Sequence, residues 1–203
     1  ELNVLEKFNP VLNPEFSSSE IVLLGNLHPA VKNAVINKST NPNRFIIMDT
    51  MNFWMDNTLD ELLSVIKKVN LIIINDEEAQ QLTDEKNIFN AGEKILKMGP
   101  EKVIIKKGEH GSIFLDQQNK YMLPAFPVEN LVDPTGAGDS FAGGIAGFLA
   151  TASEIGIREI KEAMLYGTLM ASFCVEDFGI EGLRTLDKQT LNKRLKIFKS
   201  YLT

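Results

Sequence analysis

The stretch DPTGAGDSFAGG, residues 133–144, governs how the rest of this sequence is interpreted. It places Gly136, Gly138 and Asp139 in a turn and continues into small and apolar residues that favour a helix. Glycines allow tight backbone geometry and let amide groups approach an anion. A helix that starts here adds unpaired N–H groups and the positive end of its dipole. The stretch therefore predicts an anion hole suited to a phosphate.

Asp139 is the unusual residue of this turn. An acid beside a phosphate-binding hole is electrostatically unfavourable unless it has a chemical role, and one such role is to accept the proton of a hydroxyl that attacks phosphorus. The alternative is a glycine-rich loop in which Asp139 only caps the helix. Gly143 and Gly144 lack side chains one turn later, which would let the helix approach a neighbour or a ligand closely, at a cost in helix propensity.

Three familiar motifs with similar residues can be compared with this stretch. A Walker A loop requires Gly-Lys-Ser/Thr after its spacer, where this chain has Gly143 and Gly144, and the dinucleotide fingerprint requires glycine where this chain has Phe141. GDSF (138–141) is also similar to the Gly-Asp-Ser of one class of hydrolases, in which Ser140 would need an activating histidine. Both histidines lie upstream of Ser140, an order that argues against a hydrolase without excluding it.

Apolar segments alternate with amphipathic segments along most of the chain. This alternation predicts an α/β protein with a largely parallel sheet, whose ligands bind outside the carboxyl ends of the strands. Asp49, Asn75, Lys106 and the 133–139 loop each follow a predicted strand or strand-like segment, so we expect them at that edge. A capping box between Thr58 and Glu61 is also predicted. The predicted strands are 21–25, 44–50, 71–75, 102–108, 111–116 and 120–126, and the predicted helices are 29–38, 58–69, 76–82, 87–99, 140–150, 158–175 and 187–202.

Length and composition favour one ordinary domain over residues 1–203, with 44% hydrophobic and 24% charged residues. The net charge of −6 argues against nucleic acid or an anionic membrane as a partner. Cys174 is the single cysteine, which excludes an internal disulfide and favours a reducing, cytoplasmic location. No apolar run approaches the length of a membrane span.

Three motifs together resemble those of the ribokinase-like, or PfkB-type, family of carbohydrate and nucleoside kinases. DPTGAGD (133–139) is similar to the C-terminal signature of the family, with Pro134 in place of its usual threonine. NDEE (75–78) is similar to its N-x-x-E motif, and KKGEHG (106–111) occupies the place of its nucleotide-binding loop. DTMNFW (49–54) also resembles one sugar-kinase branch. The order and spacing agree with the family, so the resemblance implies a three-layer α/β/α fold with a mostly parallel sheet.

The resemblance implies transfer of the γ-phosphoryl group of ATP to a hydroxyl of a sugar or a nucleoside. Asp139 resembles the catalytic base of the family. The resemblance also assigns an anion hole to Gly136, Ala137 and Gly138, Mg²⁺ ordering to Asn75 and Glu78, nucleotide binding to Gly108 and its neighbours, Gly111 among them, and a monovalent-cation site to the position of Asp133.

The residues themselves agree with this chemistry. Asn75 and Glu78 are three apart at a helix start and can face the same way, and one amide with one carboxylate suits Mg²⁺ held mainly by phosphates and water. The alternative is a plain helix cap. Lys106 and Lys107 could neutralise ATP phosphates, although alternation along the strand lets only one of them face the site. The alternative for both lysines is a solvated strand end.

The sequence departs from the family at its beginning. The N-terminal segment that carries the glycine-pair substrate motif, much of the sugar pocket and the β-sheet lid is not visible. The expectation is an N-terminally truncated kinase that binds ATP weakly, phosphorylates sugars poorly, and exposes an apolar surface or a sheet edge that favours a homo-oligomer. A non-catalytic nucleotide-binding fragment or regulatory relative of the same fold is the alternative.

Overall fold

The structure is a computed structural model that describes residues 8–202. The chain forms two compact units. Unit 1 runs to Lys106 and takes in Ile113–Lys120, and unit 2 comprises Lys107–Ser112 and the chain from Tyr121 onward. The expectation of one domain over residues 1–203 stays a prediction.

A six-stranded sheet confirms the predicted α/β fold. Its strands follow the chain in the order β1-β2-β3-β4-β5-β6, and β1 to β4 pair in parallel. The register sets Asp49 opposite Ile73 and Asn75 opposite Lys106, so polar residues end adjacent strands at one edge of the sheet. The strands are β1 Ile21–Leu24, β2 Phe45–Asp49, β3 Leu71–Asn75, β4 Lys102–Lys106, β5 Ser112–Leu115 and β6 Lys120–Leu123.

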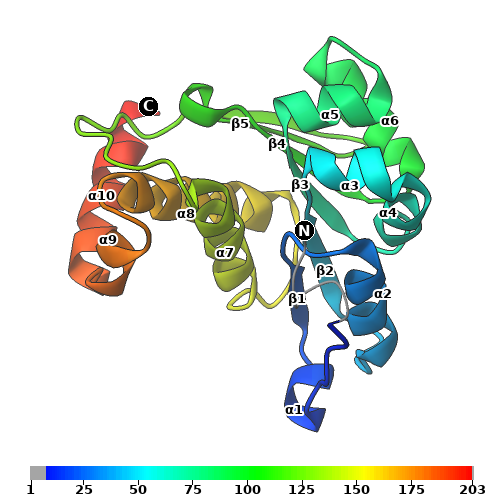
Figure 1. Cartoon of the computed structure of the whole chain (residues 1–203). Helices are drawn as coiled ribbons and strands as arrows, with labels where there is room; N and C mark the ends of the chain where they lie inside the picture. Colours follow the sequence, from blue (N-terminus) through cyan, green and yellow to red (C-terminus); the bar gives the residue numbers. More distant parts are fainter. Residues whose placement is uncertain (1–7, 203) are drawn as a thin grey trace. The chain divides into compact units, whose positions relative to one another are not determined.

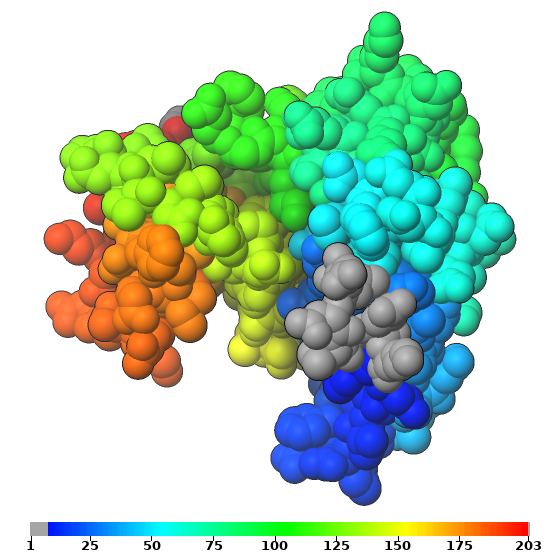
Figure 2. All heavy atoms as spheres, viewed as in Figure 1, coloured from blue at the N-terminus to red at the C-terminus, as the bar shows by residue number. Residues whose placement is uncertain are grey.

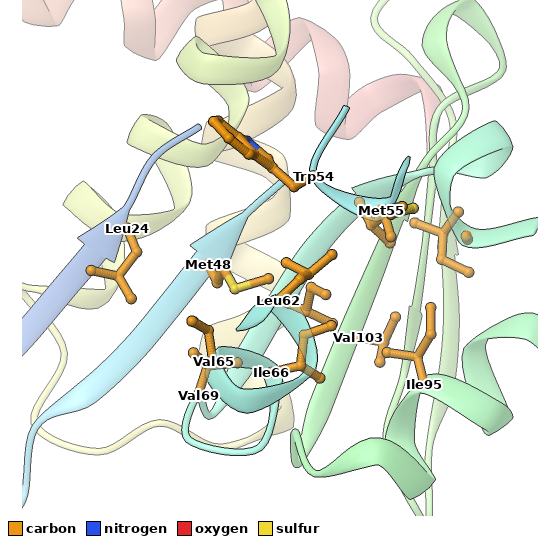
Figure 3. Packing of buried hydrophobic residues seen from close by; sticks show 14 of the residues in the cluster. Leu24, Met48, Trp54, Met55, Leu62, Val65, Ile66, Val69, Ile95 and Val103 are labelled. Atoms are coloured by element: carbon orange, nitrogen blue, oxygen red, sulfur yellow. The ribbon is translucent and has the colours of Figure 1, made fainter. Parts of the chain in front are cut away.

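Helices α2 to α6 of unit 1 pack on one face of its strands (Figure 1). Leu62 and Ile66 of α4 and Ile95 of α6 enclose Met48 and Val103 of the strands in one apolar cluster (Figure 3). In the space-filling view, α2 to α6 form the surface on the helix side of unit 1 (Figure 2). The helices are α1 Pro14–Ser17, α2 Pro29–Lys38, α3 Asn52–Asn57, α4 Leu59–Ile66, α5 Asp76–Thr83 and α6 Ile88–Met98.

The central strands are buried on both faces. Ile72 and Ile74 of β3 belong to the cluster under the helices, and Leu71 and Ile73, which alternate with them, are also fully buried. Double-sided burial explains why LIIIN is continuously apolar and does not alternate with polar residues. At the end of the strand order, β1 pairs with β2 alone among the described strands, and its Leu23 is 38% exposed. Association through this edge stays a prediction.

Unit 2 contains four α-helices and the 3₁₀ turn η2, Gly108–His110, in its described residues. A Cβ atom on Gly144 of α7 would lie 2.8 Å from the Cα of Gly167 of α8, so these helices meet at their glycines. In α10, Phe198 is buried. The helices are α7 Ala137–Leu149, α8 Ile157–Val175, α9 Glu181–Arg184 and α10 Lys188–Tyr201.

Several local predictions need correction. The strand predicted at 102–108 ends at Lys106, because the chain turns into η2 at Gly108, and helix α3 was not predicted. The capping box at Thr58 is wrong, because Thr58 also ends α3 and its hydroxyl donates to the carbonyl of Trp54 at 3.2 Å. Helix α7 begins earlier than predicted, with Gly136 as its N-cap at φ 82°. Asp139 is therefore the third residue of the helix and not its cap.

In the described part of the chain, no helix combines the length and apolar character that a membrane span requires.

Candidate active site

In unit 1, three polar side chains project from the carboxyl ends of neighbouring strands. Asn75 and Lys106 are register partners on β3 and β4, and Asp49 on β2 is the partner of Ile73. Since residues 73 and 75 point to the same face of β3, the side chains of Asp49, Asn75 and Lys106 all lie on one face of the sheet. The predicted convergence is confirmed for these three residues.

Asp49 and Lys106 form an ion pair at this edge. The Lys106 ammonium lies 3.1 Å from Oδ1 and 3.3 Å from Oδ2 of Asp49. The side chain of Lys106 is only 18% exposed and that of Asp49 only 7%, so water screens this pair less than a surface pair. The amide of Thr50 donates to Oδ1 of Asp49 at 2.9 Å, which fixes the carboxylate further.

Lys32 is a charged residue that the sequence reasoning missed. It lies on α2, is 1% exposed, and donates through Nζ to the main-chain carbonyl of Asp49 at 2.6 Å. Burial lowers the pKa of its ammonium to about 8, and the nearby charges of Asp49 and Glu78 partly oppose this shift. The sequence contained a signal for this burial, because the spacing of Pro29, Lys32 and Ile36 puts them on one face of a helix. In the structure that face is buried.

Asn75 and Glu78 form a reciprocal capping box at the start of α5. Asn75 Oδ1 accepts from the amide of Glu78 at 2.7 Å, and Glu78 Oε2 accepts from the amide of Asn75 at 3.0 Å. Asn75 and Glu78 thus act as a helix cap, which was the alternative to metal binding. The capping box uses Oε2 of Glu78 and does not involve Oε1. Burial raises the pKa of Glu78, while the bond from the Asn75 amide and the Lys106 charge lower it.

The donor set at Glu78 fits a magnesium ion held mainly by other ligands. No group of three or more His, Cys, Asp or Glu side chains with metal-site geometry occurs within residues 8–202. Mg²⁺ requires six oxygen ligands and keeps several waters, so a single carboxylate oxygen is compatible with an ion carried by phosphates.

In unit 2, residues 107–111 form a closed loop. The amide of Lys107 donates to the carbonyl of Gly111 at 2.7 Å, and the amide of Gly111 donates to the carbonyl of Gly108 at 3.1 Å. Gly111 has φ 88°, and a Cβ there would clash with the carbonyl oxygen of Leu123. Glycine at position 111 is therefore required to seat the loop. His110 is exposed in this loop.

The glycine turn of unit 2 presents backbone amides at the start of α7. Within the described residues, the amides of Gly136, Gly138 and Asp139 have no hydrogen-bond acceptor. The amide of Ala137 differs from them, since it donates to the carbonyl of Pro134 at 3.2 Å. The Asp139 side chain is exposed in the first helical turn. The turn can therefore receive an anion beside an available carboxylate.

Asp133 and His28 both have hydrogen-bond partners in the structure. Asp133 accepts the amide of Thr135 at 2.9 Å, and this bond lowers the pKa of its carboxyl group. His28, one of the two histidines considered for a hydrolase, caps α2 by accepting the amide of Ala30 at 3.1 Å. Its ring also meets that of Trp54 edge to face, with the centroids 5.1 Å apart.

The comparisons with solved structures define the class of fold first. The nucleoside kinase of Methanocaldococcus jannaschii, a member of the ribokinase family, superposes with a TM-score of 0.74 at 22% identity, over 95% of this chain and 60% of that one. A structure described as a ribokinase II candidate from E. coli, in complex with ATP and Mg²⁺, has a TM-score of 0.71 at 19% identity, over 88% of this chain and 59% of that one. The chain has a ribokinase-like α/β fold.

The sequence comparisons then identify the family. The family of pfkB carbohydrate kinases matches residues 6–184, and the chain belongs to this family. The nucleoside kinase of M. jannaschii is 28% identical over 178 residues, which cover 87% of this chain and 56% of that protein. The chain thus spans about half the length of this curated relative.

Proposed function

We propose that this chain carries the nucleotide-binding and catalytic part of a kinase that transfers a phosphoryl group from ATP to a hydroxyl of a sugar or nucleoside. The observation that carries the proposal is the start of α7, where the amides of Gly136 and Gly138 have no acceptor within residues 8–202 and the exposed Asp139 lies in the same helical turn. Membership of a carbohydrate kinase family and similarity to nucleoside kinases support it.

Within this proposal, Asp139 accepts the proton of the attacking hydroxyl while the turn binds the transferring phosphoryl group. The amides of Gly136 and Gly138 and the dipole of α7 stabilise the charge of that group. The amide of Ala137 already donates to the carbonyl of Pro134, so Ala137 serves to shape the turn and not to bind the phosphoryl group. Phosphoryl transfer depends mainly on positioning and charge stabilisation, which is what these groups supply.

Unit 1 supplies the groups for the phosphates and the metal. Lys106 places a positive charge at the edge of the sheet, and Glu78 and Asn75 are the residues that would hold Mg²⁺. When bound, Mg²⁺ neutralises phosphate charge and orients the phosphates. The loop from Lys107 to Gly111 holds the nucleotide, and Asp133 marks a monovalent-cation site. The fold neighbour from E. coli that was solved with ATP and Mg²⁺ supports these cofactors.

A second candidate function is a nucleotide-binding module without kinase activity. It is favoured by one observation, namely that the match to the M. jannaschii nucleoside kinase takes in 87% of this chain and 56% of that protein. A protein that retains the groups for ATP and lacks those for the acceptor would bind Mg·ATP without turnover.

Calorimetry with Mg·ATP, together with a phosphoryl-transfer assay on a panel of sugars and nucleosides, tests the proposal on the wild type and Asp139→Asn. A base outside the metal site should be dispensable for binding, so the Kd for Mg·ATP should change less than about threefold, while turnover should fall on the order of 10²- to 10⁴-fold. The exposed loop acid Glu154 provides the control, because Glu154→Gln removes the same charge from unit 2 and should leave both quantities unchanged.

Each outcome separates the candidates. Binding by both proteins with turnover only by the wild type supports the kinase. Binding by both proteins without turnover supports the non-catalytic module. A folded wild-type chain that binds no Mg·ATP would contradict both candidates.

A further inference from the structure

Asp49 is held by hydrogen bonds to its carboxylate and to its main-chain carbonyl, and its carboxylate binds one ammonium group, that of Lys106. The Thr50 amide donates to Oδ1, Lys32 donates to the main-chain carbonyl of the same residue, and Lys106 lies 3.1 and 3.3 Å from the two carboxylate oxygens. Both ends of Asp49 are therefore fixed to the interior of unit 1. A lysine side chain is long and flexible, and such a rigid partner limits where its ammonium group can lie.

The burial of both partners distinguishes this pair from the other lysine–carboxylate pairs of the described residues. The Asp49 side chain is 7% exposed and that of Lys106 is 18% exposed, whereas Lys120 and Glu93 in a comparable pair are 53% and 50% exposed. An exposed pair contributes little, because water screens it and both side chains are free to move. A pair with little exposure is a stronger and more directional interaction.

The charges around Asp49 also balance. Two carboxylates, Asp49 and Glu78, lie near two ammonium groups, Lys32 and Lys106. Lys32 is 1% exposed and therefore cannot reach a ligand in solvent. Lys106 stands on the same face and edge of the sheet as Asn75, its register partner. Of the two lysines, Lys106 is thus the one placed to meet a ligand, and Lys32 supplies the compensating charge behind Asp49.

We propose that Asp49 is the positioning residue that holds the Lys106 ammonium in place for the phosphate chain of a nucleoside triphosphate. The buried Lys32 in turn fixes the main chain of Asp49 through its hydrogen bond to the carbonyl. This inference rests on the proposed function, because it takes the ligand at this edge to be ATP. Asp49 acts through Lys106 and does not itself touch the nucleotide. A carboxylate is needed there because it binds an ammonium group with two oxygens, as the two distances show.

The sign of the effect of Asp49→Asn tests this role. If Asp49 acted only through its charge, its neutralisation would make the edge more positive and would tighten the binding of an anionic ligand. If Asp49 positions Lys106, the same substitution releases the ammonium group and weakens the binding. We expect the Kd for Mg·ATP to rise on the order of fivefold in Asp49→Asn and tenfold in Lys106→Met, which are typical losses for one charge-assisted contact.

Calorimetry with Mg·ATP and with adenosine should be carried out on the wild type, Asp49→Asn, Lys106→Met and the double variant. Adenosine carries no phosphate, so its Kd should stay within about twofold. The double variant should bind Mg·ATP like Lys106→Met alone, since Asp49 has nothing left to position. Lys102→Met is the matched control, because Lys102 lies on the same face of β4 at its opposite end and should leave the Kd for Mg·ATP unchanged.

Tighter Mg·ATP binding by Asp49→Asn, independent losses in the double variant, or an equal loss for adenosine would overturn the inference and leave the proposed function intact. No Mg·ATP binding by the folded wild type would overturn both. If Asp49→Asn does not fold, NMR of the lysine ammonium groups of the wild type provides the second test, with Lys106 assigned through Lys106→Met. A Lys106 signal that shifts with Mg·ATP and not with adenosine supports its phosphate contact, and an unshifted signal overturns the inference.

Discussion

Lys32 brings a positive charge into the interior of unit 1, where burial disfavours its charged form. Its ammonium group donates to the carbonyl of Asp49, and its pKa is about 8 against an ordinary value of 10.5. The group therefore binds a proton more weakly in the folded chain than in the unfolded chain. Between pH 8 and pH 10.5 the unfolded chain binds more protons, so stability rises with pH in this window.

We expect this linkage to be visible when the wild type is compared with Lys32→Met. The difference of about 2.5 pKa units corresponds to about 3 kcal/mol, so the free energy of unfolding of the wild type should rise by up to this amount, relative to the variant, from pH 7 to pH 10.5. Lys32→Met also leaves the carbonyl of Asp49 without its donor, at a cost that does not depend on pH. Urea denaturation at four pH values measures the difference. Parallel pH profiles for the two proteins would contradict a buried, weakly basic Lys32.

At the scale of elements, helices α7 and α8 approach each other through glycine. A Cβ on Gly144 would lie 2.8 Å from Gly167 Cα and 3.0 Å from the carbonyl oxygen of Tyr166, which are backbone atoms that cannot rotate away. Gly143 is its neighbour on the same helix, and a Cβ there would meet nothing within 4 Å. The close approach that the sequence indicated for this glycine pair therefore depends on Gly144.

Gly143→Ala and Gly144→Ala form a matched pair for this contact. In an exposed helix interior, alanine is favoured over glycine by about 1 kcal/mol, so Gly143→Ala should be neutral or stabilising by up to that amount. Gly144→Ala should destabilise by about 1–3 kcal/mol, because the added methyl group forces the two helices apart. Thermal and urea unfolding of both variants measures these changes. Equal effects of the two substitutions would show that the helices do not meet at Gly144.

The whole molecule offers one intrinsic probe in each unit. Trp54, the single tryptophan, lies in unit 1, and Cys174, the single cysteine, is buried in unit 2. The chain passes between the units at residues 106–107, 112–113 and 120–121, all within or next to consecutive strands of one sheet. Unfolding of one unit should therefore disturb strands that the other unit needs.

We expect a single cooperative transition. Trp54 fluorescence and the reactivity of Cys174 toward a thiol reagent should change at the same urea concentration, as a two-state domain requires. Circular dichroism provides the third measure. Midpoints that differ between Trp54 and Cys174 would show two independently folding units and would contradict the prediction of one domain over residues 1–203.

The order of strands and helices and the glycine turn could be predicted from the sequence, because these features depend on local patterns. Apolar runs such as LIIIN, the glycine at position 99 that ends α6, and the turn before α7 are each determined within a few residues. Asp49, Asn75 and Lys106 each follow a predicted strand, and this position placed them at one edge of the sheet because the carboxyl ends of parallel strands meet there. The motifs of residues 75–78, 106–111 and 133–139 were sufficient for the family.

Other features were decided by tertiary structure alone. The burial of Lys32, its bond to Asp49, the contact of Gly144 with Gly167, and the loss of the Thr58 cap to the preceding helix all depend on residues that are distant in the sequence or on the packing of neighbouring helices. Local propensity cannot specify such partners, because a buried charge or a helix–helix approach is stable only when a complementary group from another element is already in place.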